Sequence, residues 1–179
     1  MRIVGGIYKG RHFEPGNSFR ARPTTDFSKE GLFDILDNRV HWEVTDALDL
    51  FAGTGSISFE LVSRGCRKVT AVEKDFVHCK FIRKVIAELR IDNLRLYQND
   101  VFKVLARSGE AYDLVFADPP YNAPWFATAP ESILNAGVVK PGGLFILEHP
   151  KAFRFNQLPG FQEMRHYGSV HFSFFKPLQ

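Results

Sequence analysis

The stretch Asp49-Leu50-Phe51-Ala52-Gly53-Thr54-Gly55 decides the fold, because an apolar run over residues 47–51 ends there in a glycine-rich turn. Residues 57–64 follow with the composition of a helix that Gly65 closes, and residues 69–73 form a second apolar run. A strand, a tight turn, a helix and a second strand make a βαβ unit with parallel strands. The sequence therefore predicts an α/β fold.

The alternation of strand and helix continues to residue 147, and two apolar runs around Gly168-Ser169 then predict a β-hairpin. Repeated βαβ units predict a doubly wound, mostly parallel sheet of seven strands, in which the hairpin adds an antiparallel strand at an edge or inside. The expected elements are a helix that Asp75 caps and that buries Val77, Phe81, Val85 and Leu89, strands at 94–97, 112–117 and 144–147, a helix within 125–136, a turn at Pro141-Gly142-Gly143, and hairpin strands at 161–167 and 170–175.

Residues 1–25 are rich in glycine, proline and arginine and are predicted to form a short strand or hairpin appendage, an N-terminal arm before a sheet domain at 26–179. Asp26 is typical of an N-cap, because Phe27, Leu32 and Leu36 recur after it at helical spacing.

The net charge of the chain is concentrated at this end. Residues 1–30 hold six basic and three acidic side chains, a net charge of +3, which equals the net charge of the whole chain. A basic arm beside a neutral body suggests contact with phosphate, although charge alone is more often a solvated surface stretch. The basic residues are Arg2, Lys9, Arg11, Arg20, Arg22 and Lys29.

Composition excludes several classes of protein. The chain has no apolar run of the roughly 18 residues that a membrane span needs, and no signal-peptide pattern at its start. Cys66 and Cys79 form no metal-binding or disulfide pattern, and the six histidines show no metal-ligand spacing. We therefore expect a cytoplasmic protein without a membrane segment or a bound metal.

Acidic side chains stand at or just beyond the ends of four predicted strands, at Asp49, Glu73, Asp100 and Asp118. Sheets of this type bind ligands at the carboxyl ends of their strands. The repeated placement indicates a binding site there.

The glycine-rich turn and the next strand end suggest a nucleoside ligand. Gly53 and Gly55 allow a tight turn close to a ligand, but Ser58 stands where the dinucleotide fingerprint needs a third glycine, which weakens a pyrophosphate interpretation. Glu73 is placed to accept both hydroxyls of a ribose, with a surface salt bridge to Lys74 as the alternative.

Asp100 and Val101 follow the third strand. The Asp100 carboxylate could accept an adenine amino group, or it could cap the helix that begins at Val101; both roles are compatible.

The motif Asp118-Pro119-Pro120-Tyr121 after the fourth strand indicates the chemistry. Two prolines stiffen the turn and remove two backbone donors, which leaves the Asp118 carboxylate and the Pro119 carbonyl as acceptors beside an aromatic ring. Two fixed acceptors can hold both N–H groups of an exocyclic amine and direct its nitrogen at an incoming methyl group, and Asp118 can take the proton. Tyr121 could stack on a base that has left its helix.

With these motifs, the chain resembles the class I S-adenosylmethionine methyltransferases and, more closely, the bacterial RsmD family, which makes N2-methylguanine in small-subunit ribosomal RNA. The resemblance runs almost end to end. Its most specific parts are Arg2-Ile3-Val4-Gly5-Gly6-Ile7-Tyr8-Lys9-Gly10-Arg11, Arg22-Pro23-Thr24-Thr25-Asp26 and Lys29-Glu30. Two departures are Phe27, where a basic residue is expected, and Gly31, where alanine is expected and where glycine should weaken the helix.

The resemblance implies a role for each motif. S-adenosylmethionine would be the cofactor, ribosomal RNA or the assembling small subunit the partner, and the protein a monomer. Asp118, Pro119, Pro120 and Tyr121 would hold the target base, while Arg2, Lys9, Arg11, Arg20, Arg22, Thr24 and Thr25 would meet RNA or close over the site. The cofactor would bind Asp49, Gly53 and Gly55 with its methionine part, Glu73 with its ribose, and Asp100 and Val101 with its adenine. Phe51, Thr54 and Lys74 are further expected cofactor-binding residues.

The residues leave other functions open. The Asp-Pro-Pro-Tyr motif fits adenine or cytosine in DNA equally well, and protein glutamine methylation is a further possibility. An NAD-dependent oxidoreductase is disfavoured by Ser58, and a non-catalytic RNA-binding module by the intact motifs.

Overall fold

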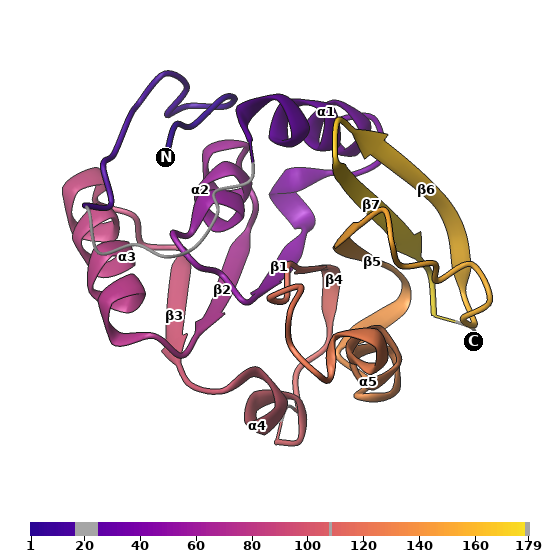
Figure 1. The fold of residues 1–179 in the computed structure, drawn as a ribbon. Coiled ribbons are helices and arrows are strands. Elements are labelled where there is room, and N and C mark those ends of the chain that lie inside the picture. The colour runs from indigo at the N-terminus through magenta and orange to yellow at the C-terminus, as the bar shows by residue number, and fades with distance from the viewer. Residues whose placement is uncertain (17–24, 108, 178–179) are drawn as a thin grey trace.

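The computed structural model describes residues 1–16, 25–107 and 109–177 and contains one seven-stranded sheet in the order β3-β2-β1-β4-β5-β7-β6 (Figure 1). Strands β1 to β5 are parallel, and β7 pairs antiparallel with both β5 and β6. The hairpin therefore inserts β7 inside the sheet and leaves β6 at its edge. The strands are β1 Asp46–Leu50, β2 Lys68–Glu73, β3 Leu94–Gln98, β4 Tyr112–Ala117, β5 Val139–Pro150, β6 Phe161–Tyr167 and β7 Val170–Phe175.

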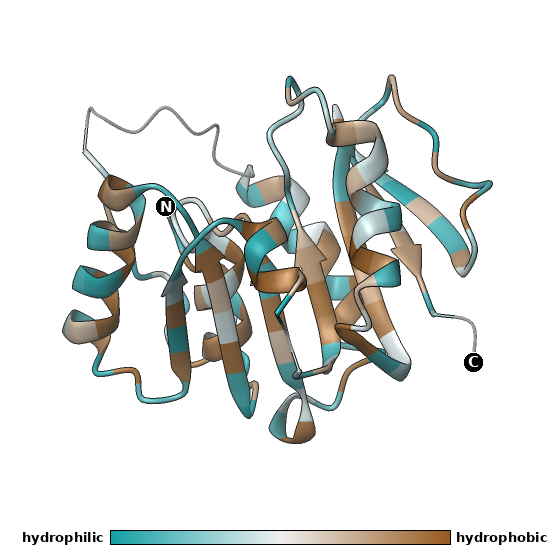
Figure 2. Ribbon diagram, turned by 90° about the horizontal axis from the view of Figure 1, so that it is seen from below, coloured by the Kyte–Doolittle hydropathy of each residue, from teal (hydrophilic) through white to brown (hydrophobic). Residues whose placement is uncertain are grey.

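Helices cover both faces of this sheet, as the prediction of a doubly wound fold requires. Helices α1 (Asp26–Leu36), α2 (Ser56–Ser63) and α3 (Phe76–Leu89) pack on one face, and α4 (Val101–Leu105) and α5 (Ala129–Asn135) on the other. Alternate residues of the strands fill the two cores, and Figure 2 shows the hydrophobic colour concentrated on the strands between the helices. Two short 3₁₀ turns, η1 (Trp42–Val44) and η2 (Phe126–Thr128), complete the elements.

Three local predictions need correction. Thr25, and not Asp26, is the N-cap of α1, since its side chain accepts from the Ser28 amide. Val77 is 43% exposed because it lies in the first turn of α3, outside the buried face. The predicted turn at Pro141-Gly142-Gly143 is an irregular part of β5, whose register with β4 shifts there. The helix predicted within 125–136 is confirmed by α5, which η2 precedes.

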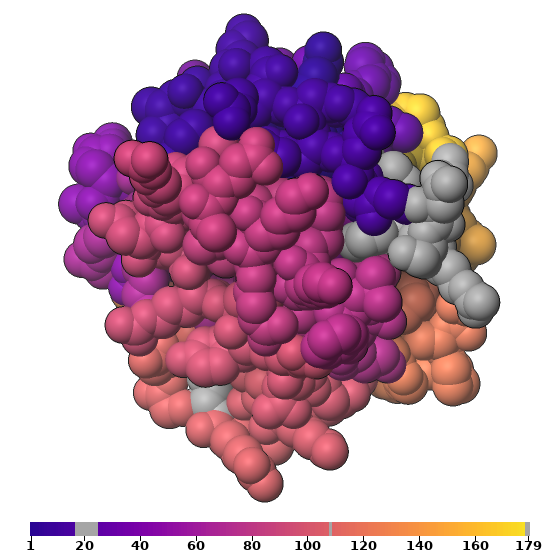
Figure 3. All heavy atoms as spheres, turned by 90° about the vertical axis from the view of Figure 1, so that its left-hand side faces the viewer, coloured from indigo at the N-terminus to yellow at the C-terminus, as the bar shows by residue number. Residues whose placement is uncertain are grey.

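The N-terminal arm is fastened to the main core over its described residues. Its ends pair through the bridge between Arg2 and His12, and Ile3 and Phe13 are buried with α1 and α2. Figure 3 shows the indigo arm lying along α3, where Arg11 forms an ion pair with Glu88. The boundary at residue 25 stays a prediction.

Beneath the arm, Lys29 of α1 is buried and forms an ion pair with Glu60 of α2 at 3.2 Å. Its ammonium group also donates to the Arg2 carbonyl and, at 3.1 Å, to the Ser56 hydroxyl. Lys29 is therefore not part of a phosphate-binding surface, although it was counted among the basic residues that suggested contact with phosphate. Across the described ranges, no helix is long and apolar enough to cross a membrane.

Candidate active site

A cavity of about 650 Å³ opens at the carboxyl ends of β1, β2, β3 and β4. Each of the four predicted acidic residues contributes to its wall. Its lining also includes Thr25, Phe51, Gly53, Thr54, Lys74, Val101, Pro119, Pro120 and Tyr121 from the predicted sites, and Phe102, Trp125, Glu148, Ser169 and Val170 from outside them. The fold therefore brings the strand-end motifs into one site.

Asp49 is held at the end of β1 by Ser58. Its Oδ2 atom accepts from the Ser58 amide at 3.0 Å and from the Ser58 hydroxyl at 2.5 Å. Burial, together with the charge of Glu73, raises the pKa of Asp49 to about 7 against the opposing effect of the Ser58 bonds. Ser58, which stands at the third glycine position of the dinucleotide fingerprint, thus holds the Asp49 carboxylate in place. Gly55 needs its glycine, because it adopts φ +75° and a β-carbon would lie 2.8 Å from the Phe59 ring.

Glu73 at the end of β2 braces the glycine turn. Its Oε2 accepts from the Gly53 amide at 2.7 Å and its Oε1 from the Asp75 amide at 2.8 Å, with His78 Nδ1 3.7 Å from Oε2. These bonds take the place of the alternative salt bridge to Lys74. The carboxylate has further lone pairs and lies in the cavity wall.

Asp100 caps α4, since its Oδ1 accepts from the amides of Phe102 and Lys103 at 3.0 and 3.4 Å. Beside it stands a wall of aromatic rings. Trp125 stacks on Phe51 with centroids 5.6 Å apart and meets Phe102 edge-on at 4.9 Å. Phe51 has φ +64°, a conformation that costs free energy outside glycine and is common at functional sites. This end of the cavity is shaped for a flat aromatic group.

The cavity wall also holds the carboxylates of Asp118 and Glu148. Glu148 of β5 accepts from the Tyr121 hydroxyl at 3.0 Å, and Tyr121 meets Phe126 edge-on. Burial raises the pKa of Asp118 well above its usual range, and the negative charges of Glu148 and Asp49 raise it further. A ligand group with N–H donors or positive charge would relieve this repulsion.

Comparisons with known proteins agree with this geometry. The family described as "Conserved hypothetical protein 95" matches residues 1–176. The ribosomal RNA small subunit methyltransferase D of Haemophilus influenzae is 32% identical over 155 residues, which cover 84% of this chain and 79% of that protein.

The chain belongs to the small subunit rRNA methyltransferase D family.

Two further similarities support the assignment. The family member of Escherichia coli is 35% identical over 123 residues, 68% of this chain and 60% of that protein. The solved structure of a putative methyltransferase from Escherichia coli is 27% identical and superposes with a TM-score of 0.82, covering 99% of this chain and 97% of the other. The fold is thus that of the methyltransferases in this family.

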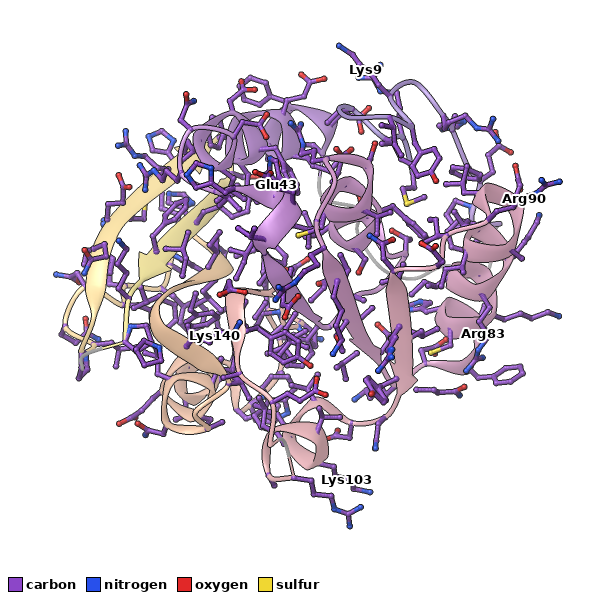
Figure 4. The ribbon with its side chains drawn as sticks, turned by 180° about the vertical axis from the view of Figure 1, so that it is seen from behind. Lys9, Glu43, Arg83, Arg90, Lys103 and Lys140 are labelled. Carbon is purple, nitrogen blue, oxygen red and sulfur yellow. The ribbon has the colours of Figure 1, made fainter. Side chains whose placement is uncertain are left out.

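The basic residues that the family resemblance assigned to RNA do not all reach the cavity. Arg2 forms ion pairs with Asp26 and Glu30 at 2.9 and 3.3 Å, and Lys9 points outward from the arm (Figure 4). Of the described members, only Thr25 lines the cavity. The predictions for Arg20, Arg22 and Thr24 lie outside the described residues.

Among the cavity residues that sequence reasoning missed are Phe102, Trp125 and Glu148. Glu148 carried a usable signal, because it is a fifth acidic residue near the carboxyl end of a strand. Trp125 and Phe102 carried none, since a lone aromatic residue in a loop or short helix is more often part of a core. Within the described chain, no group of histidine, cysteine, aspartate and glutamate residues could hold a metal ion.

Proposed function

We propose that this protein transfers a methyl group from S-adenosylmethionine to the exocyclic N2 amine of a guanine in small-subunit ribosomal RNA. The observation that carries the proposal is the placement of Asp118 and Pro119 in the wall of the strand-end cavity, which Trp125 also lines. Membership of a family whose curated relatives are named small subunit rRNA methyltransferases supports the RNA substrate.

The residues present fit S-adenosylmethionine. Buried carboxylates that raise one another's pKa favour a ligand that carries positive charge, and Asp49 lies where the resemblance puts the methionine ammonium group. Glu73 offers acceptor lone pairs to ribose hydroxyls, and the rings of Phe51 and Trp125 border a space suited to adenine. When bound, S-adenosylmethionine supplies a methyl group on a positively charged sulfur.

The target amine would be held by this chain's own acceptors. The Asp118 carboxylate and the Pro119 carbonyl can each take one N–H of the amine, which turns the nitrogen lone pair toward the methyl group. As the new N–C bond forms, the amine must lose one proton. The Asp118 carboxylate lies in the same cavity wall and can take that proton, so that the products are a methylated amine, S-adenosylhomocysteine and a protonated Asp118.

The RNA would contact α3 as well as the arm. Residues 76–87 contain Lys80, Arg83 and Lys84 and no acidic residue. The chain outside residues 1–30 therefore has a locally basic stretch, although its net charge is zero. All three side chains are exposed, and Figure 4 shows Arg83 pointing away from the body of the protein. Because α3 begins directly after the cavity residues Lys74 and Asp75, phosphates beside the target base could reach this stretch.

The proposal is tested with Asp118→Ala. We expect methylation of small ribosomal subunits to fall by about 10²- to 10⁴-fold, the usual contribution of general acid–base catalysis. The melting-temperature increase caused by S-adenosylhomocysteine should remain. Near wild-type methylation by this variant, with cofactor binding unchanged, would show that Asp118 does not hold the amine. NAD should give no increase in melting temperature. The cytoplasmic setting and the monomeric state stay predictions.

A further inference from the structure

Glu148 is a buried carboxylate in the part of the cavity that the proposed target base would occupy. Only 4% of the residue is exposed, and it lies near the carboxyl end of β5, where its backbone is opposite Phe172 of β7. Strand β7 therefore fixes the backbone of Glu148 on one side, just beyond the last residue that pairs with β4, and the side chain lines the same cavity as Asp118 and Tyr121. Burying a carboxylate costs free energy unless hydrogen-bond donors compensate it, so a buried carboxylate in this cavity suggests a functional role.

The Tyr121 hydroxyl supplies one of these donors. It donates to Oε1 of Glu148 at 3.0 Å and so ties the last residue of the Asp-Pro-Pro-Tyr motif to β5. A carboxylate has about four acceptor positions, of which this bond uses one. The negative charge of Glu148 also contributes to the raised pKa of Asp118, and both side chains line the same cavity.

The three bases that carry an exocyclic amine differ in the ring nitrogen next to it. In guanine, the N2 amine is flanked by N1, which bears a hydrogen and donates. In adenine and cytosine, the ring nitrogen beside the amine is N1 or N3, which bears no hydrogen and accepts. A carboxylate placed beside the amine on its N1 side, away from the acceptor N3 of guanine, would therefore bond to guanine and repel adenine and cytosine.

We propose that Glu148 accepts the N1–H of the target guanine and so selects guanine over adenine and cytosine, with Tyr121 as the positioning residue that orients the carboxylate. The inference rests on the proposed function and deepens it, because the Asp-Pro-Pro-Tyr motif alone fits all three bases. Asp118 and Pro119 hold the amine, and Glu148 identifies the ring to which the amine belongs. Two carboxylates in one base pocket thus have different tasks.

The test crosses one enzyme variant with one base analogue. The guanine that the wild type methylates is mapped first, and RNA is then made with 2-aminopurine at that position. This analogue keeps the amine at C2, but its N1 bears no hydrogen. We expect the wild type to prefer guanine, and Glu148→Gln to lose about 10- to 100-fold in kcat/KM on guanine, the usual effect of losing a hydrogen bond to a charged group.

The decisive quantity is the ratio of kcat/KM on the guanine RNA to kcat/KM on the 2-aminopurine RNA. In Glu148→Gln, the preference for guanine over 2-aminopurine should shrink by a similar factor, because the glutamine amide can donate to a bare N1. Loss of the O6 atom in 2-aminopurine affects both enzymes alike and cancels in this comparison. Tyr121→Phe should reduce the preference less, since it disturbs the orientation of the carboxylate without removing it.

Control variants distinguish a failure of the proposed role of Glu148 from a failure of the proposed methyltransferase function. Glu131→Gln, an exposed substitution on α5, should leave both rates unchanged, and Glu148→Gln should bind S-adenosylhomocysteine as the wild type does. An unchanged ratio in Glu148→Gln would overturn the inference and leave the proposed function standing. Failure of the wild type to methylate any guanine in ribosomal RNA would overturn both.

Discussion

The hydroxyl of Tyr167 donates to the backbone carbonyl of Gly31 at 2.8 Å, and the Tyr167 ring fills the space that a β-carbon at residue 31 would need. An ideal β-carbon there would lie 2.1 Å from Cε1 of the ring. The ring also meets Phe27 edge-on, with centroids 5.9 Å apart. The two departures from the family pattern, Phe27 and Gly31, therefore contact the same side chain and connect α1 to the β6–β7 hairpin.

This contact predicts that Gly31→Ala destabilises the protein, although alanine is normally the better helix residue by about 0.5–1 kcal/mol. The new methyl group would push Tyr167 away and break its bond to the carbonyl. We expect the free energy of unfolding to fall by about 1–3 kcal/mol, as for other overpacked sites. Urea unfolding measures it.

The control is the same substitution in a Tyr167→Ala background. Without the ring, Gly31→Ala should stabilise the helix, so the sign of the effect should reverse. A stabilising effect in the wild-type background would mean that the ring does not occupy this space.

The buried pair of Lys29 and Glu60 predicts a second stability effect. Lys29→Met leaves Glu60 buried without its cation, and breaking such a pair costs about 3–5 kcal/mol. We expect the lower end of that range, since Arg64 Nε lies 3.7 Å from the Glu60 carboxylate. Lys9→Met on the exposed arm is the matched control and should change the free energy of unfolding little. Equal effects of the two substitutions would contradict the account.

Most of the sheet could be predicted from the sequence because parallel strands covered on both faces appear as continuous apolar runs. Strand β4 has its predicted bounds, β2 and β3 differ from theirs by one residue at one end, and β1 differs by one residue at each end. The N-cap of α1 was harder to predict, because two neighbouring residues have suitable side chains. Both Thr25 and Asp26 can cap a helix, and only the bond from the Ser28 amide decides between them.

The part of the site that depends on distant residues could not be predicted. The interpretation of Lys29 as a surface charge failed because its partner, Glu60, lies on a helix 31 residues further along. Nothing in the local sequence of Trp125 or Phe102 indicates that their rings contact Phe51 in the cavity wall. Strand-end acids, by contrast, were located correctly because topology alone brings strand ends together.

The pKa of Asp49, raised to about 7, predicts that cofactor binding depends on pH. Below that pH the free protein holds Asp49 protonated, whereas a cationic ligand needs the ionised form. The affinity for S-adenosylmethionine should therefore rise at least about tenfold from pH 5 to pH 7, with release of a proton. Calorimetry in buffers of different ionisation enthalpy measures both quantities.

Asp49→Asn is the comparison for this effect. It should bind more weakly at pH 7, and its affinity should vary less with pH. Glu73 and Asp118 also interact with Asp49, so some pH dependence should remain. A wild-type affinity that is constant from pH 5 to pH 7 would contradict a role for Asp49 in binding the cation.

The basic face of α3 predicts a salt effect on RNA binding. Lys80→Glu should weaken binding to small subunits and reduce the slope of log affinity against log salt by about 0.7–0.9 for each phosphate that the variant no longer neutralises. The rate at saturating substrate should stay the same. Lys103→Glu, on α4 at the opposite face of the sheet, is the matched charge reversal (Figure 4). If both variants change the slope equally, α3 is not the specific RNA-binding surface.

The most direct measurement of the central claim is the identity of the methylated nucleoside. The protein is incubated with radiolabelled S-adenosylmethionine and small ribosomal subunits, free ribosomal RNA or duplex DNA, and each substrate is digested to nucleosides. The account predicts label in N2-methylguanosine from ribosomal RNA. Label in methyladenine or methylcytosine from DNA, or no label in any nucleic acid despite tight cofactor binding, would contradict it.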